Sequence, residues 1–145
     1  MKSKVLQNEK QKTFIIVFET GDEVMNGLLE FARQNQIRSG FFTGLGAFER
    51  VTVAFYDLEK KEYQHIPVNE QTEVMSLVGN IVLYEGEPKL HAHVVVGKRD
   101  GTAHGGHLIS ARVRPTLEIW LTASPQIIER RMNGEVGLPL IDLSD

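Results

Sequence analysis

The sequence predicts a single α+β domain in which an antiparallel sheet curls around or against one main helix. Only one stretch, early in the chain, has strong helical periodicity. Several later stretches alternate like strands, and glycine and proline residues separate them. The 145 residues lie within the usual size of one domain, and no repeat or linker divides them. We therefore expect residues 1–145 to form one domain.

The first two predicted elements are a strand and the helix. Residues 14–18 read Phe-Ile-Ile-Val-Phe, a β-branched and aromatic run that is typical of a buried strand. Thr20, followed three residues later by Glu23, has the spacing of a capping box at a helix start. The helix should extend to about residue 34, because four apolar residues recur at helical spacing: Val24, Leu28, Phe31 and Ala32.

The rest of the chain reads mainly as strands. Residues 39–48 contain three glycines, which suggests a bent or closely approached strand. The further expected strands are residues 51–55, 63–68, 73–84, 89–96, 106–113 and 116–122. The residues after Ser124-Pro125 include Gly134, Gly137 and Pro139 and look like a terminal extension packed on the surface.

Composition narrows the classes of partner. There are no cysteines, which excludes disulfides and thiolate ligands and suits a reducing compartment. The N-terminus lacks the apolar stretch of a secretory signal, and no run approaches the ~18–20 apolar residues that span a bilayer. The formal net charge of −3 argues against tight or specific DNA binding. We expect a cytoplasmic protein with no membrane partner.

Four of the five histidines cluster between residues 91 and 107. His91 and His93 point to the same face of a predicted strand, and His107 would lie across from them if the next strand forms a hairpin. His104 lies in the predicted connection and could reach the same place. Imidazoles suit zinc, copper, nickel or iron(II), and three of them would leave an open coordination position. Alternatively, these are exposed strand-end histidines that bind only water or a carboxylate.

The other motifs in the sequence do not indicate a specific functional site. Gly44-Leu45-Gly46 lacks the third glycine and the following helix of a dinucleotide site, so we interpret it as a strand bend. Arg112-Val113-Arg114-Pro115 has valine where a minor-groove hook needs glycine. No serine-hydrolase, phosphate-loop or His-Glu-x-x-His motif is present, and His65 stands alone. The roles of three polar residues on predicted strands stay open: Glu73, Asn80 and Glu118.

An ordered set of motifs resembles the PPC family, the "plants and prokaryotes conserved" domain. The motifs are Gly44-Leu45-Gly46-Ala47-Phe48, residues 73–81, His91-Ala92-His93, Asp100-Gly101, Gly105-Gly106-His107-Leu108 and Thr116-Leu117-Glu118. The resemblance covers a core of about residues 13–122 and leaves residues 123–145 as a C-terminal extension. It implies a strongly curved antiparallel sheet packed against one helix, assembled as a homotrimer.

The resemblance also implies a metal site. Carried onto this sequence, the ligands would be His91, His93 and His107, and zinc is the divalent ion we expect. His104 lies outside the shared motif, so its role as a fourth ligand is a separate hypothesis. Plant relatives join the domain to AT-hooks, but this chain has no Arg-Gly-Arg-Pro hook.

Two functional hypotheses follow. The first is a trimeric metal-binding protein with an open histidine site, able to act on a small polar or anionic molecule near a subunit boundary. The second is a DNA-associated or regulatory assembly module without catalysis. An exposed metal position beside a pocket favours the first, and a contiguous basic face favours the second.

Overall fold

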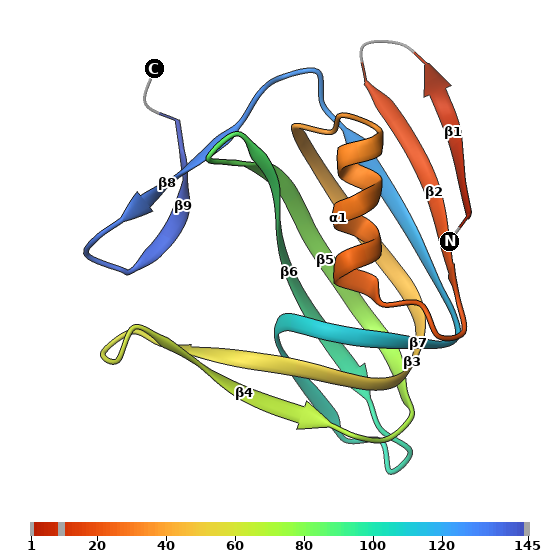
Figure 1. The fold of residues 1–145 in the computed structure, drawn as a ribbon. Helices are drawn as coiled ribbons and strands as arrows, with labels where there is room; N and C mark the ends of the chain where they lie inside the picture. Colours follow the sequence, from red (N-terminus) through yellow and green to blue (C-terminus); the bar gives the residue numbers. More distant parts are fainter. Residues whose placement is uncertain (1, 9–10, 144–145) are drawn as a thin grey trace.

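The computed structural model describes residues 2–8 and 11–143, which form nine strands and one helix. All the strands belong to one sheet of order β1-β2-β7-β3-β5-β8-β9, in which β4 pairs with β3, and β6 pairs with both β5 and β7 (Figure 1). The strands are β1 (Lys2–Asn8), β2 (Lys12–Glu19), β3 (Ser39–Asp57), β4 (Glu62–Val68), β5 (Thr72–Tyr84), β6 (Glu87–Gly97), β7 (Ala103–Ala123), β8 (Glu129–Asn133) and β9 (Leu138–Asp142).

Four of these strands close a ring, because β3 pairs with β5 and β7, and β6 pairs with the same two strands. The predicted breaks after residue 48 and around Pro115 were wrong, since β3 and β7 each continue through them. Register shifts on either side of Phe48 let β3 bend while its pairing with β7 continues. At Gly46 the backbone has φ +154° and a Cβ atom would lie 2.2 Å from the Thr116 carbonyl oxygen, so glycine is required there.

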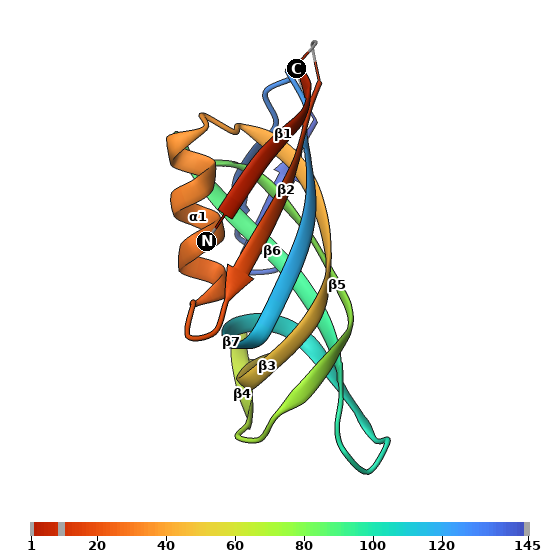
Figure 2. The same cartoon turned by 90° about the vertical axis from the view of Figure 1, so that its right-hand side faces the viewer.

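The helix α1 (Val24–Gln34) covers one face of the curved sheet (Figure 2). Its four predicted apolar residues are buried, which confirms the helical pattern. Phe31 packs edge-on against Phe14 of β2, with ring centroids 5.2 Å apart. Buried side chains of β2, β3, β5, β6 and β7 complete the core around the helix. Among the described residues, no helix has the length and apolar character needed to cross a bilayer.

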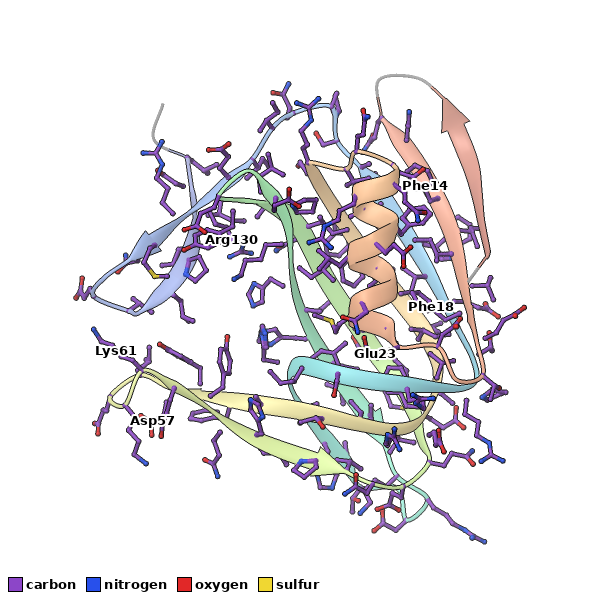
Figure 3. All side chains as sticks on the ribbon, viewed as in Figure 1. Phe14, Phe18, Glu23, Asp57, Lys61 and Arg130 are labelled. Carbon is purple, nitrogen blue, oxygen red and sulfur yellow. The ribbon has the colours of Figure 1, made fainter. Side chains whose placement is uncertain are left out.

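The predicted capping box at the helix start was wrong. Glu23 itself is the N-cap, and its carboxylate accepts a hydrogen bond from the Asn26 backbone N–H (2.8 Å) (Figure 3). A second oxygen of the same carboxylate accepts from the Ala111 N–H on β7 (3.1 Å). The Thr20 hydroxyl donates instead to the Pro115 carbonyl. The turn at Thr20 and Gly21, in which Gly21 has φ +94°, places Glu23 rather than Thr20 next to the free amides.

The C-terminal segment contains a hairpin. β8 and β9 pair with each other, and β8 adds to β5 in parallel at Leu83 and Tyr84. This hairpin lies beside the carboxyl-terminal part of β5 and carries Arg130 toward the middle of the molecule (Figures 1 and 3). The extension is therefore part of the sheet and contributes to the candidate site.

Candidate metal centre

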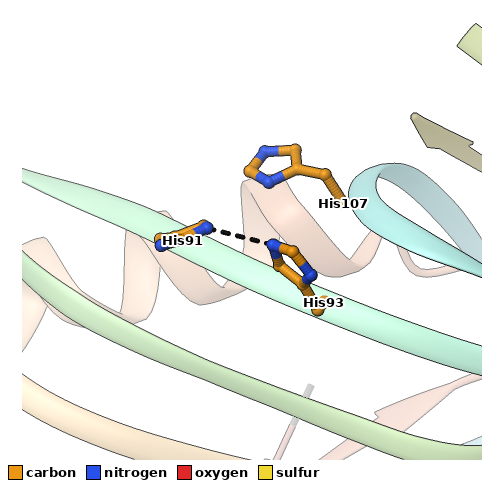
Figure 4. A group of neighbouring side chains, drawn as sticks. All are labelled: His91, His93 and His107. Atoms are coloured by element: carbon orange, nitrogen blue, oxygen red, sulfur yellow. Dashed lines mark hydrogen bonds between the residues drawn. The ribbon is translucent and has the colours of Figure 1, made fainter. Parts of the chain in front are cut away.

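Three imidazoles converge on one face of the sheet (Figure 4). His91 and His93 lie on β6, alternating with the buried Ala92 and Val94, and His93 is the register partner of His107 on β7. One ring nitrogen from each histidine lies within 4.8 Å of the others. The Nε2 atoms of His91 and His93 are 3.1 Å apart, and the three ring centroids are separated by 5.0, 5.2 and 5.4 Å.

The glycine before His107 sets how closely the strands approach. A Cβ atom on Gly106 would lie 2.7 Å from the carbonyl oxygen of Ala54, so only glycine allows β7 to run this close to β3. Gly105 and Gly106 both belong to β7, which begins at Ala103, three residues before the predicted strand start. Ala54 on β3 is the register partner of His107, which fixes the position of the imidazole above the sheet.

His104 lies outside this group. It is the register partner of Val96, whose side chain is buried on the opposite face from His93. Since neighbours across a ladder share a face, the His104 side chain projects away from the other three rings. His65 is exposed on β4 and is likewise not part of the group.

The protonation of the cluster suits a metal. Burial, helped by the positive fields of His91 and His93, lowers the pKa of His107 to about 4. Burial and the neighbouring Arg130 also lower the pKa of His91. Both rings are therefore neutral near pH 7, which is the form that binds divalent ions.

The distances between the histidine nitrogens are also compatible with a bound metal ion. Two imidazoles bound to one tetrahedral zinc at 2.0–2.1 Å would have nitrogens about 3.3 Å apart. The 3.1 Å separation in the structure is close to this value, although it equally fits an N–H···N hydrogen bond. The His107 Nδ1 atom is buried and has no hydrogen-bond partner in the described part of the chain. The donor set and this unpartnered nitrogen both fit a divalent ion.

Two neighbours of the histidines gave no signal in the sequence. The Tyr63 ring of β4 lies against His107, with centroids 4.8 Å apart. Arg130 of β8 donates through Nη2 to Asn80 Oδ1 at 2.8 Å, and the same nitrogen lies 3.3 Å from His91 Nδ1. Asn80 is the register partner of His91, so its side chain shares the histidine face.

A pocket of about 180 Å³ adjoins the cluster. It lies between the histidine strands and the β8–β9 hairpin, and its lining includes Tyr63, Lys89, His91, His107, Arg130 and Leu140. The two carboxylates left open by the sequence are elsewhere. Glu73 lines a separate surface hollow with Glu70 and Lys98, and Glu118 is the exposed register partner of Leu45.

Comparison with known proteins identifies a family and several solved structures of similar fold. A sequence model of the Plants and Prokaryotes Conserved (PCC) domain matches residues 6–125; this is the family, abbreviated PPC above, whose motifs the sequence resembles. No curated protein sequence matches the chain.

Three solved structures are similar over nearly their whole length. A plant- and prokaryote-conserved protein of Pyrococcus horikoshii is 30% identical, with a TM-score of 0.86 over 99% of this chain and 96% of that one. A metal-containing protein of Archaeoglobus fulgidus is 33% identical, with a TM-score of 0.84 over 94% and 97%. A Bacteroides thetaiotaomicron protein described as a "putative DNA-binding protein" is 28% identical, with a TM-score of 0.87 over 97% and 96%.

Proposed function

Because the chain belongs to the Plants and Prokaryotes Conserved domain family, we propose that it is a metal-binding protein. Its His91, His93 and His107 hold one divalent ion, for which zinc is the first candidate. The convergence of three ring nitrogens within 4.8 Å is the observation that carries this proposal. The similarity to a metal-containing protein that is 33% identical supports it.

Three protein ligands would leave one coordination position of a bound ion open. A zinc ion held by His91, His93 and His107 would supply Lewis-acid chemistry or an activated water. The chain's own residues prepare the site: burial keeps His107 neutral, and Tyr63 holds its ring from one side. Asn80 holds Arg130 next to His91. The pocket beside the histidines gives a small molecule access to the same place.

We further propose that the chain assembles as a homotrimer through the face that carries the histidines. A cross-strand row runs from Trp120 to Thr43, Val78 and His93 on four neighbouring strands. Large apolar side chains on this face are exposed, and they include Phe41, Leu45, Val78, Val95 and Trp120. Such a patch usually marks an interface, which would bring a subunit boundary close to the metal site.

The alternative is a DNA-associated assembly module, motivated by the relative described as a "putative DNA-binding protein". The net charge of −3 opposes it, because neutralisation of phosphates supplies most of the affinity for DNA. We therefore retain it only as the second candidate.

The metal site is tested by elemental analysis of purified protein after metal-supplemented growth, together with an anomalous scattering map of crystals. The wild type should contain about one ion per chain. His93→Ala should lose most of it, because two imidazoles hold zinc poorly at low concentration. His104→Ala and His65→Ala are matched controls and should keep their metal. A metal-free wild type, or full occupancy in His93→Ala, would refute the proposal.

A further inference from the structure

Arg130 is a buried cation without a counter-charge among the residues that the structure describes. Its residue is only 8% exposed, and its partners are the neutral Asn80 side chain, the Pro139 carbonyl and His91 Nδ1. Its Nε atom is buried and unpartnered, and no carboxylate within the described ranges forms an ion pair with it. Burial lowers the pKa of Arg130, and the Tyr63 phenol beside it opposes this effect only in part.

An unpaired buried charge is costly, so its retention beside a pocket points to an anion that binds there. Lys89 lines the same pocket and adds a second positive charge. A guanidinium presents a planar fork of N–H donors that matches a carboxylate. Because Nε is buried, the terminal Nη1 and Nη2 groups, which also contact Pro139 and Asn80, are the donors that can meet a ligand.

The walls of the pocket select a small ligand. Besides the two cations and the two histidines, the lining consists of Tyr63, Leu90, Leu138, Pro139 and Leu140. Its volume of about 180 Å³ is below the ≈ 300–1,000 Å³ of ordinary ligand pockets. A molecule with one anionic end and a short apolar body fits both the charge and the size.

A metal ion bound to the histidines would increase the affinity of the pocket for an anion. If His91 binds an ion through Nε2, the nitrogen that faces His93, the neutral ring carries its proton on Nδ1. His91 then cannot accept a hydrogen bond from Arg130, and the guanidinium loses one of its few acceptors. The positive charge of the ion adds to that of Arg130 and Lys89. Anion and metal should therefore favour each other's binding.

We propose that this pocket binds a small organic carboxylate, whose carboxylate group pairs with Arg130 while its apolar part lies against Leu138 and Leu140. The full affinity rests on the metal site proposed above, because the ion supplies part of the attraction. The pairing with Arg130 does not depend on it.

The test is a calorimetric titration of butyrate into the protein with and without bound zinc. A cobalt(II)-loaded sample provides a second reading through its visible spectrum. Butyrate should bind, and it should bind more tightly to the zinc form. Butyramide has the same shape without the charge and should bind at least about tenfold more weakly, as expected for a lost charged hydrogen bond.

Variants assign the effect to Arg130. Arg130→Met should weaken butyrate binding about tenfold or more and should melt no lower than the wild type, since it removes an uncompensated buried charge. Arg131→Met is the matched control, because the Arg131 side chain is 69% exposed and pairs with Asp142. If Arg130→Met does not fold, Arg130→Lys keeps the charge but loses the fork and should also bind more weakly.

Several results would overturn the assignment: equal butyrate affinity in Arg130→Met, equal binding of butyramide, or tighter binding of inorganic phosphate than of butyrate. A lower oligomer mass in Arg130→Met would assign the missing counter-charge to a second copy of the chain and would also overturn it. Metal content is measured separately. If the zinc-loaded wild type does not bind butyrate, only the carboxylate pocket is refuted. If butyrate binding depends on Arg130 in a protein that binds no metal, only the metal site is refuted.

Discussion

The environment of His107 links the candidate site to stability. Its ring contacts those of Tyr63 and His91, at centroid distances of 4.8 and 5.2 Å, and is partly buried. This surrounding disfavours the charged imidazolium, so the pKa of His107 falls to about 4. The same desolvation that prepares the ring as a ligand makes the folded protein sensitive to acid.

We predict that the metal-free protein loses stability as the pH falls from about 6.5 to about 4, the unfolded and folded pKa values of His107. In this range the unfolded chain binds a proton that the folded chain excludes, so protonation favours unfolding. Below about pH 4 both states are protonated at His107, and its contribution levels off. Denaturant unfolding measured between these pH values checks the profile.

His107→Gln should flatten that part of the profile, because glutamine does not titrate. His65→Gln is the control, since His65 is exposed on β4 and lies outside the cluster. An unchanged pH slope in His107→Gln would show that another group causes the sensitivity.

The sequence predicted the three clustered histidines but not their surroundings. His91 and His93 share a strand face, and the family motif adds His107, so local spacing was enough. Arg130 lies 39 residues from His91, in a segment without a recognisable motif. Contacts of this kind depend on how distant strands assemble, which single-sequence patterns do not encode.

At the scale of elements, apolar periodicity located the strands that build the core. It missed β1, β8 and β9. The first two have the mostly polar sequences Lys-Ser-Lys-Val-Leu-Gln-Asn and Glu-Arg-Arg-Met-Asn, whereas β9, Leu-Pro-Leu-Ile-Asp, contains a proline and lay in the predicted surface extension. These strands form through backbone pairing toward the sheet edges, so no alternating apolar pattern is needed. Periodicity also divided β3 and β7, because a register shift resembles a strand end when only side chains are read.

The helix start gives an element-scale prediction. Glu23→Ala should lower the free energy of unfolding by about 0.5–2 kcal/mol, the usual range for a lost N-cap. It removes the acceptor for the Asn26 N–H and also frees the Ala111 N–H of β7. Urea unfolding checks the loss.

Thr20→Ala is the comparison, since its hydroxyl makes only an exposed hydrogen bond to the Pro115 carbonyl. It should cost less than Glu23→Ala. A larger loss in Thr20→Ala would restore the capping box that the sequence suggested and contradict the assignment of Glu23 as the cap.

For the whole molecule, charge sets the expectation for DNA. With a net charge of −3 and no AT-hook, the protein should bind DNA weakly and without sequence preference. Any residual binding should fall steeply with salt in an electrophoretic or anisotropy assay. A nanomolar, sequence-selective complex at ~150 mM salt, which specific modules typically reach, would favour the alternative function.

The outer face of the sheet bears on assembly. One helix covers only one face, and the opposite face exposes apolar side chains over β3, β5, β6 and β7. Trp120, at 50% exposure, belongs to the row that ends at His93. Burial of this surface between subunits would remove apolar area from water, at roughly 25 cal/mol for each Å².

The exposed face predicts self-association, and the resemblance to the PPC family predicts that the assembly is a trimer. Light scattering at micromolar concentration should therefore report about three times the 16.3 kDa chain mass. Trp120→Glu places a charge in the middle of the exposed apolar face and should shift the protein toward monomer, because burial of an unpaired carboxylate opposes association. Leu58→Glu makes the same kind of change at the exposed β3–β4 turn and should leave the mass unchanged. A wild type that stays monomeric, or a Trp120→Glu variant with the wild-type mass, would show that this face is not the subunit interface.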